Sequence, residues 1–157
     1  MSWKKYRNQF QKEYPDESNF IIGIDLGNKT SSIAYFDLNR KVSEVIDISG
    51  GYGKPSIPTV IQYVKESKDW VFGEYAVLNN TGTDKKFYSL LDGLGTKKYF
   101  DIDDKPISLV NILSMYIKEL ISNCKNLNPR AIVSGIVVSV PNYITDEQLE
   151  ELNFALY

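Results

Sequence analysis

The side chains best suited to bind a ligand or take part in a reaction lie in residues 21–36, IIGIDLGNKTSSIAYF. Asp25 ends an apolar run, and Gly27 follows two positions later. An aspartate at the end of a buried strand directs its carboxylate out of the sheet. There it can hold hydrated Mg²⁺, which usually keeps several waters and binds through one or two carboxylates. Glycine in the following turn lets the backbone come close to a ligand.

The residues after Gly27 could form an anion-binding turn. The backbone N–H groups of Asn28, Lys29 and Thr30 follow one another and can donate to phosphate oxygens. An aspartate in such a turn is also frequent for a purely structural reason, because its carboxylate caps its own backbone. The turn by itself leaves both interpretations open.

Two other nucleotide-binding motifs, the P-loop and the dinucleotide-binding fingerprint, are absent. The segment GGYGKP at residues 50–55 has glycines and a lysine, but Ile48 stands where a P-loop has its first glycine. Pro55 replaces the hydroxyl residue and removes a backbone N–H. No G-x-G-x-x-G opens a helix after a strand, so the dinucleotide fingerprint is missing too. We therefore interpret residues 50–58 as a connecting loop.

Composition excludes several kinds of catalytic site. The chain has 157 residues and no histidine, which rules out Ser-His-Asp and Cys-His nucleophile systems and imidazole zinc sites. Eighteen basic and 20 acidic side chains give a net charge of −2, so the composition disfavours nucleic-acid binding. Any chemistry must use carboxylates, lysines, hydroxyls or a bound metal.

The same features predict a cytoplasmic protein. A single cysteine, Cys124, cannot form an internal disulfide, and a reducing compartment is the simplest interpretation. The first residues, MSWKKYRNQF, lack the apolar core of a signal peptide. No apolar run of about 18 residues is present that would span a membrane. We expect no membrane partner.

The elements that must position Asp25 follow an α/β pattern. Strands are expected at 20–26, 31–37 and 42–49 as a meander, then at 59–64 and 70–72, with helical turns after Gly73; residues 81–105 show no clear pattern. The apolar face of residues 108–127 predicts a long core helix. The nearly continuous apolar runs 20–26 and 131–140 predict strands buried on both faces. Thr145 and Gln148 form a capping-box pattern, so a last helix should begin near Asp146.

Residues 1–19 are interpreted as an N-terminal extension. Trp3, Tyr6, Phe10 and Tyr14 recur near helical spacing among charged residues, and Pro15 would end the helix. The aromatic stripe is expected to pack on the body of this domain or on a neighbouring one. Membrane binding is disfavoured because the charge balance of the segment is close to neutral.

Several separated blocks of the chain resemble the DnaK-type seventy-kilodalton heat-shock chaperones. They are residues 21–36, PSIPTVIQYV at 55–64, VFGEYAV at 71–77, the long helix, and IVVSVPNYITDEQLEEL at 136–152. They occur in the family's order and at similar spacing. The strand-turn-strand at Asp25 and the V-P-x-Y-x-x-D-x-Q block at 140–148 are the most specific parts of the resemblance.

This resemblance implies the first lobe of an actin-like, ribonuclease H-like ATPase domain over residues 20–157, cut at its C-terminus. The expected fold is a mixed sheet with a β-meander, followed by a long helix, a strand and a helix. In the family two such lobes enclose MgATP and hydrolyse it, and this drives the binding of client polypeptides with cochaperones.

The resemblance also implies roles for individual residues. Gly27, Asn28, Lys29 and Thr30 match the turn that contacts the β- and γ-phosphates of ATP, and Asp25 matches the aspartate linked to Mg²⁺ through water. Pro141 matches the proline that couples nucleotide state to domain rearrangement, and Asn142, Tyr143 and Asp146 fall in the same block.

The chain departs from the family pattern in two places. Asn28 and Lys29 replace residues that carry hydroxyls in the family. The position of the family's catalytic lysine is occupied by Leu91, so no catalytic residue is predicted. Phosphoryl transfer depends on positioned cations, and removing one such donor costs on the order of 10²-fold or more in rate. The chain is therefore expected to hydrolyse ATP poorly. Because it resembles only one of the two lobes that enclose the nucleotide, the chain by itself is expected to be a weak or inactive half-site.

Two alternative functions remain open. The chain could be a degenerate, non-catalytic interaction module, which Leu91 favours. It could also belong to another branch of the actin-like superfamily, such as the sugar kinases or filament proteins, which begin with a similar aspartate-glycine turn. The block at 140–148 favours the chaperone branch.

Overall fold

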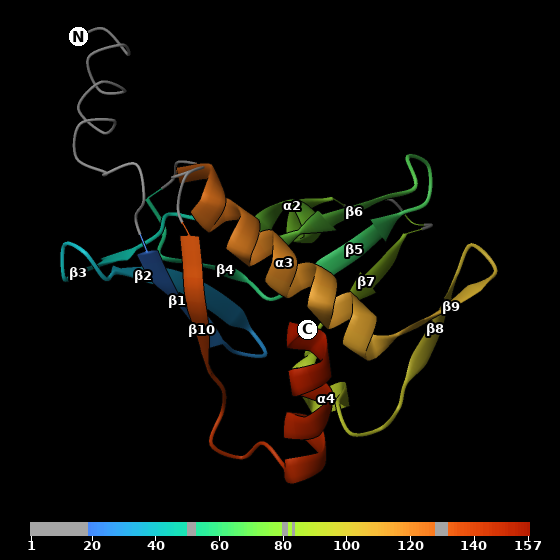
Figure 1. The fold of residues 1–157 in the computed structure, drawn as a ribbon. Helices are drawn as coiled ribbons and strands as arrows, with labels where there is room; N and C mark the ends of the chain where they lie inside the picture. Colours follow the sequence, from blue (N-terminus) through green and yellow to red (C-terminus); the bar gives the residue numbers. More distant parts are fainter. Residues whose placement is uncertain (1–18, 50–52, 80–81, 83, 128–131) are drawn as a thin grey trace, which may run out of the picture.

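The structure, a computed structural model, describes residues 19–49, 53–79, 82, 84–127 and 132–157. The aromatic stripe from Trp3 to Tyr14 lies outside these residues. The architecture is mixed α/β, as expected (Figure 1). Among the described residues, no helix combines the length and the apolar character needed to cross a bilayer.

A mixed sheet of five strands forms the centre of the fold. It contains β1 (Asn19–Leu26), β2 (Thr30–Asp37), β3 (Val42–Val45), β4 (Ser56–Pro58) and β10 (Ile132–Ser139). The strand order is β10-β1-β2-β3, and β4 also pairs with β2. β1 runs parallel to β10 and antiparallel to β2, and β2 runs antiparallel to β3 and β4. The expected meander of three strands is present, but its third strand ends at Val45 rather than at Ser49.

A second layer follows in the middle of the chain. β5 (Ile61–Val64) pairs antiparallel with β6 (Asp69–Phe72) and β7 (Lys85–Phe87), and the short helix α2 (Gly73–Leu78) follows β6. The region without a clear sequence pattern contains β7, the 3₁₀ turn η1 (Leu91–Gly93) and the start of a hairpin. That hairpin joins β8 (Tyr99–Ile102) to β9 (Lys105–Ser108).

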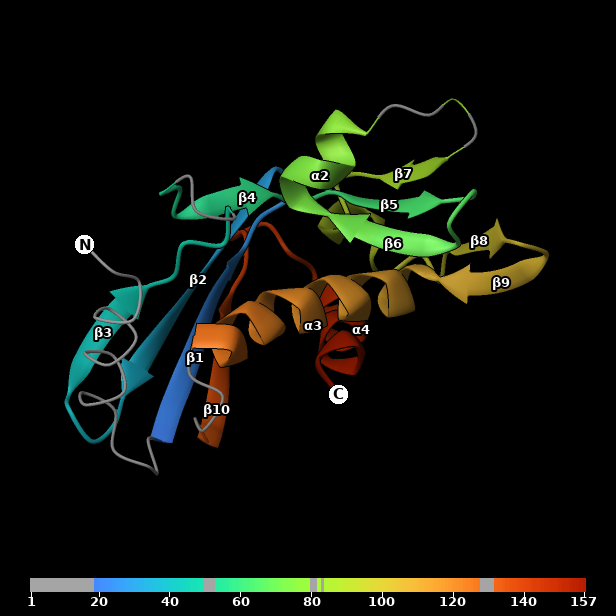
Figure 2. The same ribbon diagram turned by 90° about the horizontal axis from the view of Figure 1, so that it is seen from above.

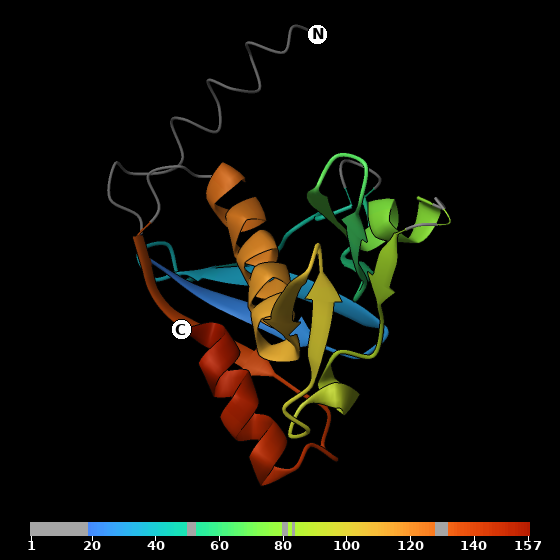
Figure 3. The same ribbon diagram turned by 90° about the vertical axis from the view of Figure 1, so that its right-hand side faces the viewer.

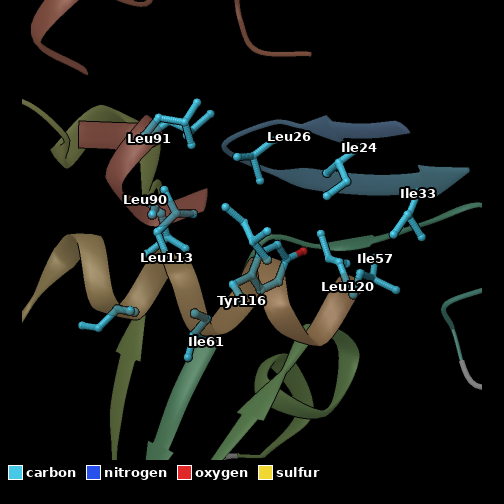
Figure 4. Packing of buried hydrophobic residues seen from close by; sticks show 14 of the residues in the cluster. Ile24, Leu26, Ile33, Ile57, Ile61, Leu90, Leu91, Leu113, Tyr116 and Leu120 are labelled. Carbon is cyan, nitrogen blue, oxygen red and sulfur yellow. The ribbon is translucent and has the colours of Figure 1, made fainter. Parts of the chain in front are cut away.

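The long helix α3 (Leu109–Leu127) lies between these two layers and organises the core (Figures 1 and 2). Its buried face includes Leu113, Tyr116 and Leu120, whose side chains lie among residues from both sheets in Figure 4. The core around them includes Ile24, Leu26, Ile33, Ile57, Ile61, Leu90 and Leu91. The apolar periodicity of α3 correctly predicted this helix because burial of one face stabilises an amphipathic helix.

The last helix, α4 (Asp146–Leu156), packs beside α3 (Figure 3). Its capping box is confirmed: the Thr145 hydroxyl accepts a hydrogen bond from the Gln148 N–H at 3.3 Å, and the Gln148 side chain accepts one from the Thr145 N–H at 2.9 Å. This reciprocal pair satisfies backbone donors that an uncapped helix start would leave free.

The burial of the two most apolar strands differs from the prediction. β1 alternates between buried and more exposed residues, and β10 has no fully buried residue. The reason is that α3 and α4 lie on the same side of the central sheet (Figure 2). The opposite face carries Val45 and Val137, each 63% exposed. In the described part of the chain, one face of the sheet is therefore covered and the other is open.

Candidate functional site

Asp25 lies at the carboxyl end of β1, in an exposed position. The parallel register pairs it with Ser139, the last residue of β10. The Ser139 hydroxyl donates a hydrogen bond to Oδ1 of Asp25 at 2.6 Å. Carboxyl ends of parallel strands are where open α/β sheets bind ligands. The carboxylate is thus oriented by a side chain of the neighbouring strand, not folded back onto its own turn.

Gly27 closes the turn that follows Asp25. Its N–H donates to the Thr30 carbonyl at 3.2 Å, which makes a tight hairpin between β1 and β2. A Cβ atom at position 27 would lie 2.7 Å from that carbonyl oxygen, closer than real Cβ atoms come. Glycine is required here because the backbone itself occupies the space that a side chain would need.

The tip of the turn presents two free backbone donors. Lys29 uses its carbonyl to accept a hydrogen bond from the Thr59 N–H at 2.9 Å. Within the described part of the chain, the N–H groups of Asn28 and Lys29 have no hydrogen-bond partner. The Lys29 side chain is exposed. The turn therefore offers two amides and one ammonium group to an anion.

The Asn28 side chain is committed to other parts of the fold. Its Nδ2 donates to the Asp92 carboxylate at 2.6 Å and to the Tyr143 hydroxyl at 2.9 Å. Its Oδ1 accepts hydrogen bonds from the N–H groups of Leu91 at 3.0 Å and Asp92 at 3.4 Å. One side chain thus ties the turn to η1 and to the loop after β10. Only the backbone of Asn28 remains available for a ligand.

Leu91 lies in the core and is only 2% exposed. Its N–H donates to Asn28, and its carbonyl accepts a hydrogen bond from Nε2 of Gln148 at 3.1 Å. The main chain of Leu91 consequently links the turn to α4, while its side chain belongs to the buried hydrophobic cluster (Figure 4). The position predicted to correspond to the chaperones' catalytic lysine therefore presents no cation to the site.

The loop between β10 and α4 carries the remaining predicted residues. Pro141 begins a tight turn in which its carbonyl accepts from the Ile144 N–H at 3.2 Å. Tyr143 reaches Asn28 from this loop, whereas Asp146 lies in the first turn of α4. The structure thus places Asp25, the turn at 27–30, Leu91 and the loop at 141–143 around one end of the sheet. Sequence reasoning missed Ser139 and Asp92, because nothing local in the sequence marks them as neighbours of Asp25 and Asn28.

The loop that superficially resembles a P-loop has its described donors satisfied within the chain. The Asp47 carboxylate accepts hydrogen bonds from the Ser49 N–H and hydroxyl and from the Gly53 N–H. These bonds, of which the Ser49 hydroxyl contributes most, lower the pKa of Asp47. The Lys54 ammonium pairs with Glu74 at 3.0 Å. This geometry agrees with a connecting role for residues 53–55. The prediction was wrong for Ser56–Pro58, which form β4 and pair with β2, and residues 50–52 lie outside the described residues.

Two cavities lie elsewhere on the described surface. One, of about 550 Å³, is lined by Tyr63, three lysines and residues 101–104. The other, of about 530 Å³, lies between the β8–β9 hairpin and α4. Neither includes Asp25 or the turn at 27–30. The candidate site is therefore an open sheet end.

The residues at this end of the sheet suit a cation that keeps most of its water ligands better than a cation surrounded by protein ligands. No group of three or more Cys, Asp or Glu side chains within the described ranges is placed to hold a metal ion. Asp25 is one exposed carboxylate whose second oxygen has no partner among the described residues. Mg²⁺ that keeps most of its waters and is shared with a phosphate needs no more than one or two carboxylates.

The chain matches the model of a known family. The C-terminal model of the family of unknown function DUF5716 matches residues 43–155, more than half of the chain. The chain belongs to the DUF5716 family. The match begins within β3 and ends within α4, so it includes Leu91 and Pro141 but not Asp25 or the turn at 27–30. The DUF5716 description assigns no activity to these residues.

Proposed function

We propose that this chain is a nucleotide-binding lobe of the actin-like ATPase type, related to the heat-shock chaperone ATPases. In this proposal Asp25 holds hydrated Mg²⁺, and the amides of Asn28 and Lys29 bind the phosphates of ATP. Bound Mg²⁺ would neutralise phosphate charge. The residues of the chain orient the ion and the phosphate tail.

The observation that carries the proposal is the geometry of the central sheet. An antiparallel meander, β1 to β3, is followed by a long helix and by β10, which returns parallel to β1 on its other side. This arrangement supports a ribonuclease H-like topology. It brings Asp25, Ser139 and two free backbone donors to the carboxyl end of the parallel pair, where anionic ligands bind in related sheets.

The same geometry supports binding without efficient hydrolysis. Leu91 is buried, and the one cation in the turn, Lys29, projects from an exposed tip. Because phosphoryl transfer requires cations positioned at the developing charge, we expect no phosphate release above the uncatalysed background. A non-catalytic interaction module is the second candidate, and the buried leucine favours it.

Binding is tested by NMR titration of the ¹⁵N-labelled full chain with MgATP. We expect weak affinity, with a Kd of roughly 0.1 to 1 mM, because only one carboxylate, two amides and the exposed Lys29 ammonium group contribute. The largest shifts should occur at the Asn28 and Lys29 amides. Absence of shifts at millimolar MgATP, or shifts confined to other residues, would refute the nucleotide-binding proposal.

Two matched variants show whether the charge of Asp25 has a specific effect on MgATP binding or only changes the net charge of the protein. Asp25→Asn keeps an oxygen that accepts the Ser139 hydrogen bond but removes the charge, so it should weaken MgATP binding at least several-fold and abolish its dependence on Mg²⁺. Asp104→Asn makes the same change on the exposed β8–β9 turn and should leave affinity unchanged. Equal effects of both variants would show that Asp25 has no specific role.

A further inference from the structure

The side-chain amide of Gln148 makes two hydrogen bonds with different parts of the chain. Its Oε1 accepts a hydrogen bond from the Thr145 N–H at 2.9 Å, which belongs to the capping box of α4. Its Nε2 donates to the Leu91 carbonyl at 3.1 Å, a residue 57 positions earlier in the chain. One end of the amide therefore caps the helix, and the other end holds η1.

Only the second of these bonds requires a glutamine. A capping box takes either glutamate or glutamine at this position, because the cap needs only an acceptor. An ionised carboxylate has no N–H to donate. A glutamate at position 148 would still cap α4, but it would place an acceptor against the Leu91 carbonyl oxygen. The glutamine therefore meets a requirement of η1 and not of α4.

Leu91 joins Gln148 to the turn at 27–30. The Leu91 N–H donates to Oδ1 of Asn28 at 3.0 Å, and the Leu91 side chain is buried in the core. Because the N–H and the carbonyl belong to one residue, a displacement of the carbonyl moves the N–H as well. Four hydrogen bonds use both donors and both acceptor sites of the Asn28 side chain. The position of Asn28 is therefore tied to the position of η1.

The start of α4 also packs against the segment that follows η1. The Gly95 N–H donates to Oε2 of Glu151 at 2.8 Å. Gly95 has a φ of +80°, and a Cβ atom there would lie 3.4 Å from Cβ of Glu147 and 3.6 Å from the backbone nitrogen of Gln148. The backbone of residues 91–95 is thus held by the Asn28 side chain and by two side chains of α4.

We propose that Gln148 is a positioning residue for the turn at 27–30. It fixes the Leu91 main chain, which fixes the Asn28 side chain and with it the free N–H groups of Asn28 and Lys29. These amides bind phosphate in the proposed function, on which this inference rests. Gln148 orients the two donors from α4 without itself touching the nucleotide.

An exchange of two residues within α4 tests this role at constant composition and net charge. The double variant Gln148→Glu/Glu151→Gln removes the donor to Leu91. It keeps an acceptor for the Thr145 N–H and another for the Gly95 N–H. In the NMR titration of the full chain, we expect MgATP to bind about three- to tenfold more weakly. Glu151→Gln alone keeps all three contacts, so its affinity should change by less than about twofold.

The double variant is expected to remain folded. Its capping box is retained, and the Leu91 carbonyl still accepts a hydrogen bond from the Leu94 N–H at 3.2 Å. Circular dichroism should therefore give the helix content of the parent chain. Parent-like MgATP affinity in the folded double variant would overturn the proposal. Equal weakening in the double variant and in Glu151→Gln would overturn it too, because only the double variant loses the bond to Leu91.

A measurement on the parent chain requires no variant. The ¹⁵N signal of the Gln148 side-chain amide should shift together with the Asn28 and Lys29 amides as MgATP is added. Since the three groups belong to one hydrogen-bonded unit, their shifts should give the same Kd. A stationary Gln148 signal while the two turn amides shift would contradict the positioning role.

Spectra without nucleotide keep this inference separate from the ATP-binding proposal. In the ligand-free double variant, the Asn28 and Lys29 amides should lie at different chemical shifts from those of the parent, whereas in Glu151→Gln they should not. Unmoved turn amides would refute the role of Gln148 even if the parent binds MgATP. Moved turn amides in a chain that binds no MgATP would support the link from α4 to the turn and refute only the nucleotide proposal.

Discussion

The hydroxyl of Ser139 donates a 2.6 Å hydrogen bond to the carboxylate of Asp25, a residue 114 positions earlier in the chain. The bond crosses from β10 to β1 at the carboxyl end of the parallel pair. Ser139→Ala should lower the free energy of unfolding by about 0.5 to 1.5 kcal/mol, because one hydrogen bond on an exposed site is lost. Urea denaturation measures the change. Ser134→Ala, at an exposed position of the same strand, is the control and should change stability by less than about 0.5 kcal/mol.

Gly27→Ala should destabilise the chain because its Cβ would press on the Thr30 carbonyl oxygen at 2.7 Å. Moving backbone to relieve such an overlap costs about 1 to 3 kcal/mol. Gly135→Ala is the matched control, since a Cβ there meets nothing within 4 Å. It should be neutral or stabilising by up to about 1 kcal/mol, because alanine is the better strand residue. Thermal unfolding measures the stability of both variants. A lower melting temperature for Gly135→Ala than for Gly27→Ala would contradict this prediction.

Asn28→Ala removes four hydrogen bonds that join the turn, η1 and the loop after β10. The N–H of Leu91 is left without its acceptor in a half-buried place, so we expect a loss of about 1 to 3 kcal/mol. Asn111→Ala alters an exposed asparagine in the first turn of α3 and should have a small effect. The backbone amides of Leu91 and Asp92 should then exchange their hydrogens faster in Asn28→Ala but not in Asn111→Ala. Uniformly faster exchange in both variants would contradict this role.

Tyr63 should make stability fall at high pH. Its hydroxyl donates to the Asp103 carboxylate at 2.6 Å, and this bond, together with burial and nearby negative charge, raises the pKa of Tyr63 from 10.0 to about 12. Because the folded pKa exceeds the unfolded one, the stabilisation is complete below pH 10 and is lost as the pH rises towards 12. Tyrosine ionisation is followed by absorbance as the pH rises. Subtracting the titration curve of Tyr63→Phe from that of the parent chain gives the ionisation step of Tyr63. Asp103→Asn should move it back towards pH 10, and a step that stays at 12 would refute the assignment.

Cys124 should resist thiol reagents while the chain is folded. The side chain is buried in the core, and burial raises the pKa of its thiol to about 12. Since the thiolate is the reactive form, modification near neutral pH requires opening of α3. The reaction rate with a disulfide reagent should therefore increase with urea along the unfolding curve. Rapid labelling in the absence of denaturant would show that this end of α3 is loosely packed.

Local patterns predicted most of the elements that surround the site. The helix at 109–127 and the capping box at Thr145 and Gln148 depend on short-range spacing, which a sequence displays directly. Residues 81–105 resisted prediction because η1 and the hairpin that follows it are short. η1 is held by hydrogen bonds from distant parts of the chain, since the Leu91 N–H donates to Asn28 and the Leu91 carbonyl accepts from Gln148.

The sequence by itself determined that Asp25 ends a strand, that a glycine turn follows it, and that no lysine stands at position 91. Tertiary structure alone decided that Ser139 orients Asp25, that the Asn28 side chain is engaged with η1 and Tyr143, and that one face of the sheet stays open among the described residues. The physical reason is that the spacing of apolar residues along the sequence indicates which residues prefer to be buried. The partners that satisfy a polar side chain, and the face that a helix covers, depend on how distant segments pack together.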